Sequence, residues 1–324
     1  MTSGDDLAAT GEFGLIAALA RRLPQGLGVL IGPGDDAAVV ASSDGRVVVT
    51  VDLVVEGVLF RRDWAAPDEI GRRAAAASLA DVAAMGARPT ALVVGLAAPA
   101  STQTSWALRL VDGLRDEAAL VGASVVGGDV TAGDQVVVSV TALGDLEGRA
   151  PVTRSGARAG DVVAVCGRLG WAAAGLAVLR RGFGSPRALV EAYRRPQPPY
   201  AAGLDAAVAG ASAMCDVSDG LVADLGHVAV ASGVVIDVDR AALEVGEPLS
   251  AVAAAYGVDP LEWVLTGGDD HALVATFPAD AARPEGFAVI GRVRAVAPGT
   301  DEEPHVRVDD VPWSGPAGHG HFSG

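Results

Sequence analysis

Residues 213–238, AMCDVSDGLVADLGHVAVASGVVIDV, carry the alternation that predicts the fold. A short apolar run at 213–216 is typical of a buried strand, and residues 218–231 place apolar side chains at helical spacing. Residues 234–238 then form a second apolar run. Strand and helix patterns that follow one another in this way are typical of mixed α/β layers.

The same alternation extends over the rest of the chain. Short Val-rich runs predict strands at 47–52, 91–96, 124–127, 136–142, 161–166, 272–277 and 287–291, besides the two already given. Longer Ala/Leu-rich segments predict helices at 68–85, 103–121, 171–181, 200–209, 218–231 and 249–256. The predicted fold class is α/β (α+β), with two mixed α/β domains.

The division into domains follows from length and from one segment. A chain of 324 residues exceeds what a single hydrophobic core usually supports. Residues 148–160, GRAPVTRSGARAG, combine Gly, Pro and Arg without apolar periodicity, as a hinge does. We therefore expect domains at 1–150 and 151–324, with an irregular tail from Asp301.

Composition restricts the partners. The net charge of −16 repels nucleic acids and anionic membrane surfaces, so neither partner is expected. No apolar run is long enough to span a bilayer. The first residues, MTSGDDLAATGEFG, carry acids where a secretory signal has basic residues, so we expect a cytoplasmic protein.

Several kinds of chemistry are disfavoured by the residue types. All 24 basic residues are Arg, which excludes a Walker A lysine, a kinase strand lysine and a Schiff base. Cys166 and Cys215 lie in apolar runs, as small buried side chains do. Zinc-ligand spacing and a Gly-x-Ser-x-Gly elbow are absent from the sequence, so zinc hydrolysis and serine nucleophile chemistry are disfavoured.

Two aspartates in the first half need an explanation. Asp36 follows Gly32 and Gly34 in a loop that permits tight backbone geometry, although an Asx turn alone also explains it. Asp52 interrupts an apolar strand that looks buried on both faces, and Thr50, two residues earlier, projects to the same face. A buried carboxylate without a partner is costly.

The other candidate carboxylates lie on predicted helices and at predicted strand ends. Asp81 lies on the helix at 68–85 without a cation at helical spacing, and Asp129 ends a strand after two glycines. Asp216 ends the strand of the opening segment, Asp219 lies in the first turn of the next helix, and Ser218 is its plausible N-cap. A turn alone is an alternative explanation of Asp129, and capping alone would explain Ser218 and Asp219 but not Asp216. Taken together, the carboxylates favour hard divalent cations, with Mg²⁺ the best candidate, and phosphoryl transfer as the chemistry.

Eight ordered motifs resemble the thiamine-monophosphate kinase family, within the larger group that includes aminoimidazole ribonucleotide synthetase and selenophosphate synthetase. These motifs are GEFGLI, GPGDDAAVV, VTVDLVVEGVLF, SLADVAAMGARP, VVGGDVTAG, VTRSGARAGD, CDVSDGLVADLGHV and WVLTGGDDHAL, from Gly11 to Leu273. By this resemblance the magnesium ligands are Asp36, Thr50, Asp52, Asp81, Asp129, Asp216 and Asp219. The implied ATP contacts are Gly128, Asp129, Arg154 and Ser218.

The resemblance implies transfer of the ATP γ-phosphate to thiamine monophosphate, in a homodimer whose interface involves the N-terminal domain. By the same resemblance Leu59, Asp269 and Trp313 contact the acceptor. Two departures concern these positions, because the family has His-Phe where this chain has Leu59-Phe60, and GGED where it has GGDD.

The predicted acceptor is a phosphate monoester, which is mostly doubly ionised at neutral pH and needs no general base or covalent nucleophile. Two like charges about 4 Å apart repel by roughly 4 kcal/mol at an effective dielectric constant of 20, so bound cations would assist. Two other hypotheses are a ligase like aminoimidazole ribonucleotide synthetase and a non-catalytic nucleotide-binding regulator.

Overall fold

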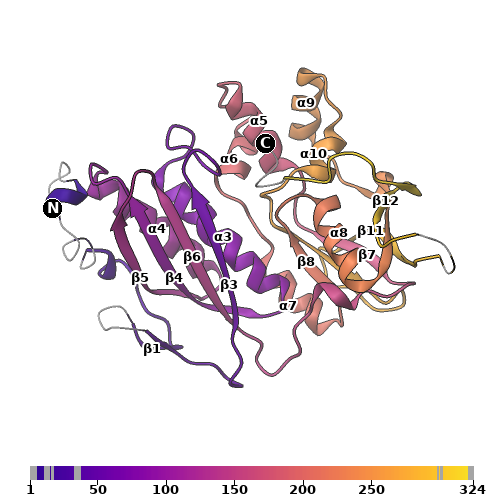
Figure 1. Cartoon of the computed structure of the whole chain (residues 1–324), viewed down its shortest axis with the longest axis horizontal. Coiled ribbons are helices and arrows are strands. Elements are labelled where there is room, and N and C mark those ends of the chain that lie inside the picture. The colour runs from indigo at the N-terminus through magenta and orange to yellow at the C-terminus, as the bar shows by residue number, and fades with distance from the viewer. Residues whose placement is uncertain are drawn as a thin grey trace. The chain divides into compact units, whose positions relative to one another are not determined.

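The computed structural model describes residues 6–10, 15, 18–32, 38–297, 299 and 302–319. The chain forms two compact units. Unit 1 consists of Met1–Val82 and Ala87–Arg149, and unit 2 consists of Ala83–Gly86 and Ala150–Gly324 (Figure 1). The chain therefore passes into unit 2 within one helix, returns, and leaves unit 1 finally after Arg149.

Unit 1 contains a four-stranded sheet of order β3-β6-β4-β5. Its strands are β3 (Val48–Val55), β4 (Arg88–Ala98), β5 (Ser124–Ala132) and β6 (Val137–Asp145). β4 pairs parallel with β5, and the other two pairs are antiparallel. A separate two-stranded sheet joins β1 (Val29–Ile31) and β2 (Val39–Val40), and the short helix α1 is Leu7–Thr10.

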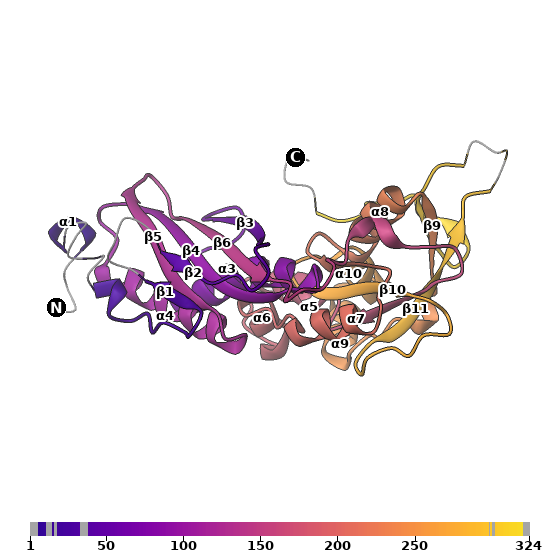
Figure 2. The ribbon, with the colours of Figure 1, turned by 90° about the horizontal axis from the view of Figure 1, so that it is seen from below.

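Two helices, α3 (Pro67–Ala84) and α4 (Thr104–Leu120), lie on the same face of this sheet (Figure 1, Figure 2). They approach closely because glycines lie at the contact. A Cβ on Gly71 would lie 2.0 Å from the Leu110 carbonyl oxygen, and one on Gly113 would lie 2.0 Å from that of Asp68. Any larger residue at either position would separate the two helices.

The other face of the sheet is open along β3. Val49, Val51 and Leu53 are 58–64% exposed, whereas Thr50 and Asp52 between them are partly buried towards α3. The expectation that this strand is buried on both faces is therefore wrong. An apolar edge strand has the same composition as a central one, so the sequence pattern does not distinguish them.

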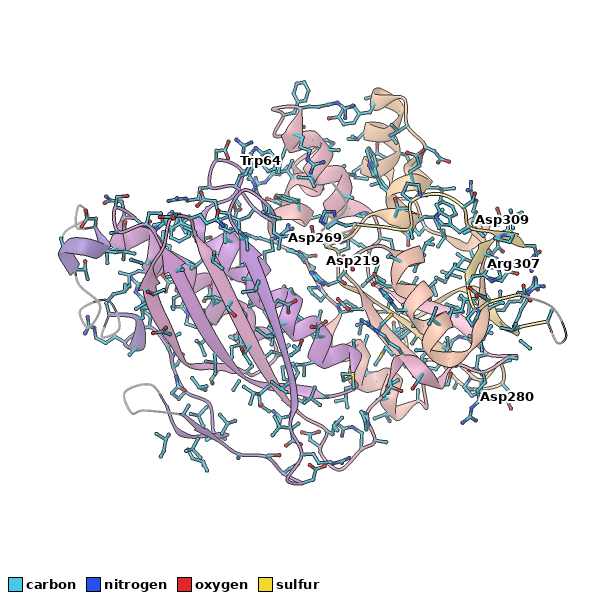
Figure 3. All side chains as sticks on the ribbon, in the orientation of Figure 1. Trp64, Asp219, Asp269, Asp280, Arg307 and Asp309 are labelled. Atoms are coloured by element: carbon cyan, nitrogen blue, oxygen red, sulfur yellow. The ribbon has the colours of Figure 1, made fainter. Side chains whose placement is uncertain are left out.

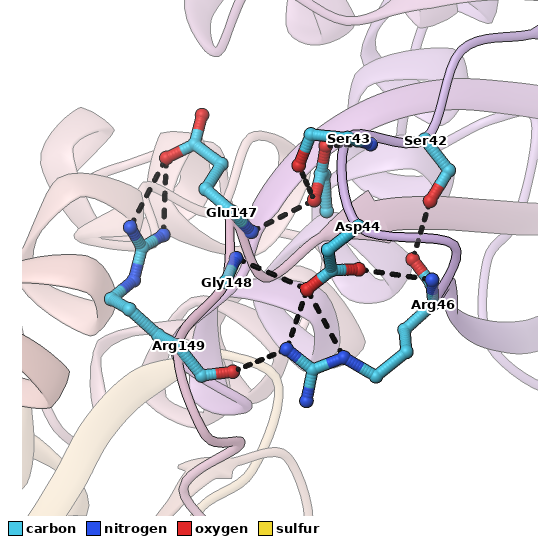
Figure 4. A network of polar contacts seen from close by, with 8 residues as sticks. Ser42, Ser43, Asp44, Arg46, Glu147, Gly148 and Arg149 are labelled. Atoms are coloured by element: carbon cyan, nitrogen blue, oxygen red, sulfur yellow. Dashed lines mark hydrogen bonds and ion pairs between the residues drawn. The ribbon is translucent and has the colours of Figure 1, made fainter.

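A polar network connects the loop before β3 to the residues that follow β6 (Figure 4). Asp44 accepts hydrogen bonds from Arg46 and from the backbone N–H of Gly148, and Arg46 also donates to the Arg149 carbonyl oxygen at 3.0 Å. The bond from Arg46 holds the pKa of Asp44 below its ordinary value. The loop before β3 is thus tied to the residues that follow β6.

Unit 2 contains a seven-stranded sheet of order β13-β12-β9-β11-β7-β10-β8. β12 pairs parallel with β9, and the other pairs are antiparallel. The strands are β7 (Val162–Cys166), β8 (Ala213–Val217), β9 (Val234–Val238), β10 (Ala272–Phe277), β11 (Ala288–Ala295), β12 (Val306–Val308) and β13 (Val311–Pro312). Phe277 and Phe287 meet edge to face in a core beside β10, with ring centroids 5.4 Å apart.

The helices of unit 2 are α5 (Trp171–Arg180), α6 (Arg187–Arg194), α7 (Tyr200–Val208), α8 (Leu221–Ser232), α9 (Glu247–Tyr256) and α10 (Pro260–Thr266). Short 3₁₀ helices lie at η1 (Arg154–Gly156) and η2 (Arg240–Ala242). α5, α6, α9 and α10 pack against one another, whereas α8 packs on β8 and β9. None of the helices in the described ranges is both long and apolar enough to cross a membrane.

Two expectations about unit 2 are corrected. The tail after Asp301 is not wholly irregular, because Val306–Val308 pairs with β9, and Val311–Pro312 pairs with Val306–Val308. The helix of the opening segment begins at Leu221, with Gly220 at the N-cap and no side-chain cap from Ser218. Asp224, in the first turn of α8, instead accepts the backbone N–H groups of Asp219 and Gly220.

Candidate active site

In unit 1, β3 and α3 bring three of the predicted ligands together. The Thr50 hydroxyl donates to Asp81 at 2.7 Å, and the Ser78 hydroxyl donates to Asp52 at 2.7 Å. Thr50 and Asp52 share one face of β3, and Ser78 and Asp81 lie one turn apart on α3. Two carboxylates and two hydroxyls therefore line one contact between a strand and a helix.

Asp129 lies elsewhere in the same sheet. β5 continues through Asp129 to Ala132, so this residue does not end its strand as expected. The register aligns Asp129 with Gly95, Ser139 and Leu53, and it aligns Gly128 with Val94, Val140 and Asp52. Because side chains alternate along a strand, Asp129 is on the open face and Asp52 on the α3 face.

Gly128 is explained by packing within the sheet. A Cβ at this position would lie 2.0 Å from the Val94 carbonyl oxygen of β4, whereas one at Gly127 would meet nothing within 4 Å. Gly128 is thus required by the neighbouring strand, independently of any ligand, whereas Gly127 leaves the main chain open to approach.

An apolar pocket adjoins these glycines. Leu110, Val111 and Leu114 of α4 line one side of it. Residues of β4 and β5, among them Gly127–Val130, line the other side. A flat apolar ring would fit such a lining.

In unit 2, Asp216 is buried at the end of β8 and only 3% exposed. His271 Nδ1 lies 3.0 Å from Asp216 Oδ2. Ser218 and Asp219 follow in the loop, where the backbone N–H of Asp269 donates to the Ser218 carbonyl oxygen at 2.8 Å. Asp219 and Asp269 belong to these two adjoining loops, and both are labelled in Figure 3.

Asp224 is a site residue that the sequence analysis missed. Its Oδ2 accepts hydrogen bonds from the backbone N–H groups of Asp219 and Gly220, so it closes the loop from the first turn of α8. Burial and the nearby charge of Asp216 raise its pKa to about 7. The carboxylate reaches back to the N-cap N–H of Gly220 from four residues ahead, one more than the capping-box spacing, so the sequence carried no standard signal for it.

Asp270 lies in the loop before β10 and is buried against the start of α5. Its Oδ1 accepts the Ala172 N–H at 3.0 Å, whereas its buried Oδ2 meets no hydrogen-bond donor among the described residues. Burial raises its pKa to about 7. The native state therefore keeps the proton over a pH range in which the unfolded chain has released it.

Asp270→Asn is expected to stabilise the magnesium-free protein at pH 8. Wild-type unfolding free energy should fall as pH rises from about 4 to about 7, because the raised pKa makes ionisation of native Asp270 costly. The difference between the ordinary pKa of an aspartate and the pKa of about 7 for Asp270 corresponds to roughly 4 kcal/mol of unfolding free energy, as an upper bound. Urea unfolding of wild type and variant in EDTA at pH 4.5 and pH 8 measures the change in unfolding free energy. Asp259→Asn, at an exposed helix cap, is the control. Equal effects of Asp270→Asn at both pH values would contradict the assignment.

The remaining predicted residues lie as follows. Arg154 is exposed in η1, and its carbonyl oxygen accepts from the Ser232 hydroxyl at 2.8 Å. Leu59 is partly buried in the turn after β3, and its N–H donates to the Val55 carbonyl oxygen. Trp313 is partly buried, and its indole N–H donates to the Pro316 carbonyl oxygen at 3.0 Å. Asp36 lies outside the described residues.

The donor chemistry of these groups fits Mg²⁺. Carboxylate and hydroxyl oxygens dominate both the β3–α3 contact in unit 1 and the Asp216–Asp219 loop in unit 2, and hard cations prefer oxygen ligands. Within the described residues, no group of three or more His, Cys, Asp and Glu side chains is close enough to hold one ion. The structure thus gathers Thr50, Asp52 and Asp81 in unit 1 and the Asp216–Asp219 loop in unit 2, and it does not gather Asp129 with the first set.

Comparison with known proteins defines the class. Residues 34–146 match the family described as AIR synthase related protein, N-terminal domain, and residues 158–299 match the corresponding C-terminal domain. The chain is therefore an AIR synthase related protein with both domains, which confirms the predicted fold class.

Relatives at higher identity narrow the assignment. Thiamine-monophosphate kinase of Mycobacterium tuberculosis is 51% identical over 98% of this chain and 93% of its own, and that of Corynebacterium glutamicum is 40% identical over 90% and 89%. A structure described as AaThiL complexed with AMPPCP and TMP has a TM-score of 0.76 and 32% identity, covering 94% of this chain and 96% of its own. The chain belongs to the thiamine-monophosphate kinase family.

Proposed function

We propose that this protein transfers the γ-phosphate of ATP to thiamine monophosphate, which yields thiamine diphosphate and ADP. Membership of the family supports the reaction, and the carboxylate and hydroxyl groups shared by β3 and α3 support a cation-assisted mechanism. The observation that carries the mechanism is the buried Asp216 beside Asp219, because a buried carboxylate requires a compensating charge.

The acceptor needs no activation by the protein. A phosphate monoester is mostly doubly ionised at neutral pH, so one of its oxygens attacks the γ-phosphorus directly as ADP leaves. Mg²⁺, when bound, supplies the positive charge that offsets repulsion between these anions. Transfer is in line, without a phosphoenzyme.

The chain's own residues then have distinct roles. The proposed magnesium ligands are Asp36, Thr50, Asp52, Asp81, Asp129, Asp216 and Asp219. The proposed ATP contacts are Gly128, Asp129, Arg154 and Ser218, with the Arg154 guanidinium suited to a phosphate. The proposed acceptor contacts are Leu59, Asp269 and Trp313. We also propose domains at 1–150 and 151–324 and a cytoplasmic location.

We propose that adenine occupies the apolar pocket beside β5. Val111→Phe should fill part of it and raise the KM for ATP about tenfold, a loss of roughly 1.4 kcal/mol, with kcat less affected. Leu120→Phe, at the exposed end of the same helix, is the matched control. Steady-state kinetics with ATP varied measure the effect, and an unchanged KM in a folded Val111→Phe protein would locate adenine elsewhere.

We propose a homodimer formed through the open face of the unit 1 sheet. The exposed row of Val49, Val51 and Leu53 supports this, because burying each such side chain contributes about 1.5–3 kcal/mol. Val51→Asp should give a monomer by size-exclusion chromatography with light scattering. Val208→Asp, exposed on α7, should leave the dimer intact. A monomeric wild-type protein, or a dimeric Val51→Asp variant, would contradict this interface.

Product analysis tests the reaction. The protein is mixed with ATP and Mg²⁺, then with thiamine monophosphate, thiamine or the acceptor of aminoimidazole ribonucleotide synthetase, and ADP and products are quantified. ADP and thiamine diphosphate should form in equal amounts with thiamine monophosphate alone. ADP formation with the third acceptor would favour the ligase, and ATP binding without ADP would favour the regulator.

A further inference from the structure

His271 and Asp216 form a buried pair within unit 2. Their side chains are 6% and 4% exposed, and Nδ1 of His271 lies 3.0 Å from Oδ2 of Asp216. The backbone holds both residues in place, because β8 and β10 pair with Ala272 opposite Val217, and the His271 N–H donates to the Val217 carbonyl oxygen. The contact is therefore fixed by the sheet at both ends.

The loop before β10 is bent to deliver this histidine. His271 has φ +52° and Asp269 has φ +69°, in the left-handed region that costs most residues roughly 1–2 kcal/mol. Non-glycine residues persist there only when their surroundings determine the conformation. The buried contact with Asp216 is one such determinant, because the tautomer with its hydrogen on Nδ1 donates to a carboxylate oxygen of Asp216.

We propose that His271 is a positioning residue for magnesium binding, whose Nδ1–H holds Oδ2 of Asp216 so that Oδ1 is presented to the cation. This inference rests on the proposed function, in which Asp216 is a magnesium ligand. Groups that hydrogen-bond to a metal ligand orient it, and their removal typically reduces metal affinity or activity 10–100-fold. A histidine that served packing alone would change stability and leave the magnesium dependence unaltered.

Two substitutions separate these roles. His271→Phe keeps a ring and removes the donor, whereas His271→Asn places an amide N–H near the Nδ1 position and tolerates positive φ. The Mg²⁺ concentration for half-maximal ADP formation, at saturating ATP, should rise about 10–100-fold in His271→Phe and stay within about threefold in His271→Asn. His227→Phe, an exposed position on α8, should behave as wild type.

A direct binding measurement accompanies the kinetics. Each protein is titrated with Mn²⁺ in the presence of a non-hydrolysable ATP analogue, and free Mn²⁺ is followed by electron paramagnetic resonance. The Mn²⁺ affinity should fall in His271→Phe and stay close to wild type in His271→Asn. If His271→Phe does not fold, His271→Ala removes the donor without overpacking and should give the same result. Absence of thiamine diphosphate from the wild-type reaction would defeat the proposed function, while the Mn²⁺ titration would still test the pair.

Three outcomes would overturn the proposal. Folded His271→Phe or His271→Ala protein could bind Mn²⁺ and respond to Mg²⁺ as wild type does. The Asn variant could be as impaired as the Phe variant, which would show that the donor is not the determinant. The midpoint temperature of thermal unfolding could fall in His271→Phe while the magnesium dependence stays unchanged, as expected of a residue that serves packing alone.

Discussion

Asp216→Asn should lower kcat for ADP formation at least about tenfold while the protein stays folded. Asn has the shape of Asp and still offers an oxygen to His271 Nδ1–H, so the buried contact of 3.0 Å is retained. The variant loses one negative charge that faces the cation. Two charges about 4 Å apart interact by roughly 4 kcal/mol at an effective dielectric constant of 20, and 1.36 kcal/mol is a tenfold change in rate.

Asp280→Asn is the matched control, because Asp280 is exposed in unit 2 and labelled in Figure 3 away from Asp219. Circular dichroism and thermal unfolding establish that both variants are folded, and coupled ADP release gives kcat across Mg²⁺ concentrations. Wild-type turnover of Asp216→Asn at saturating Mg²⁺ would remove Asp216 from the magnesium set.

Asp129→Asn should lower kcat/KM for ATP at least about tenfold. Asp129 is exposed on the edge strand β5, next to the apolar pocket, so its loss should not affect folding. A carboxylate in that position can hold a cation that accompanies the ATP phosphates, which affects both binding and turnover.

Asp134→Asn, exposed in the loop between β5 and β6, provides the comparison for Asp129→Asn. Kinetics with ATP varied at fixed Mg²⁺ should leave Asp134→Asn at the wild-type value. If both variants retained wild-type kcat/KM, Asp129 would have no role in ATP binding or turnover.

Regular elements with strong periodicity could be predicted from the sequence. The expected strand at 272–277 is β10, and the expected helix at 249–256 falls within α9. Short elements framed by proline were missed. α10 begins at Pro260 after the Asp259 cap, which is a recognisable start signal, but seven residues carry too little periodicity to be seen. α6 likewise lies between Pro186 and later prolines, and no helix was expected there.

The candidate site could be predicted as a set of residues and not as a geometry. Thr50 and Asp52 were expected on one face of a strand, and the structure adds their partners Ser78 and Asp81 on α3. A contact between residues 26 to 31 positions apart depends on how the helix packs, which local patterns do not determine. The placement of Asp129 on the opposite face depends on strand order and register, which the sequence does not state.

The central claim is that these oxygen ligands hold divalent cations around ATP and the acceptor phosphate. Crystals grown with Mn²⁺, a non-hydrolysable ATP analogue and thiamine monophosphate give anomalous peaks that locate the cations directly. The account predicts peaks within about 2.5 Å of carboxylate oxygens of Asp52 or Asp81 and of Asp216 or Asp219. Ordered nucleotide and acceptor, with no anomalous peak beside any of these carboxylates, would contradict it.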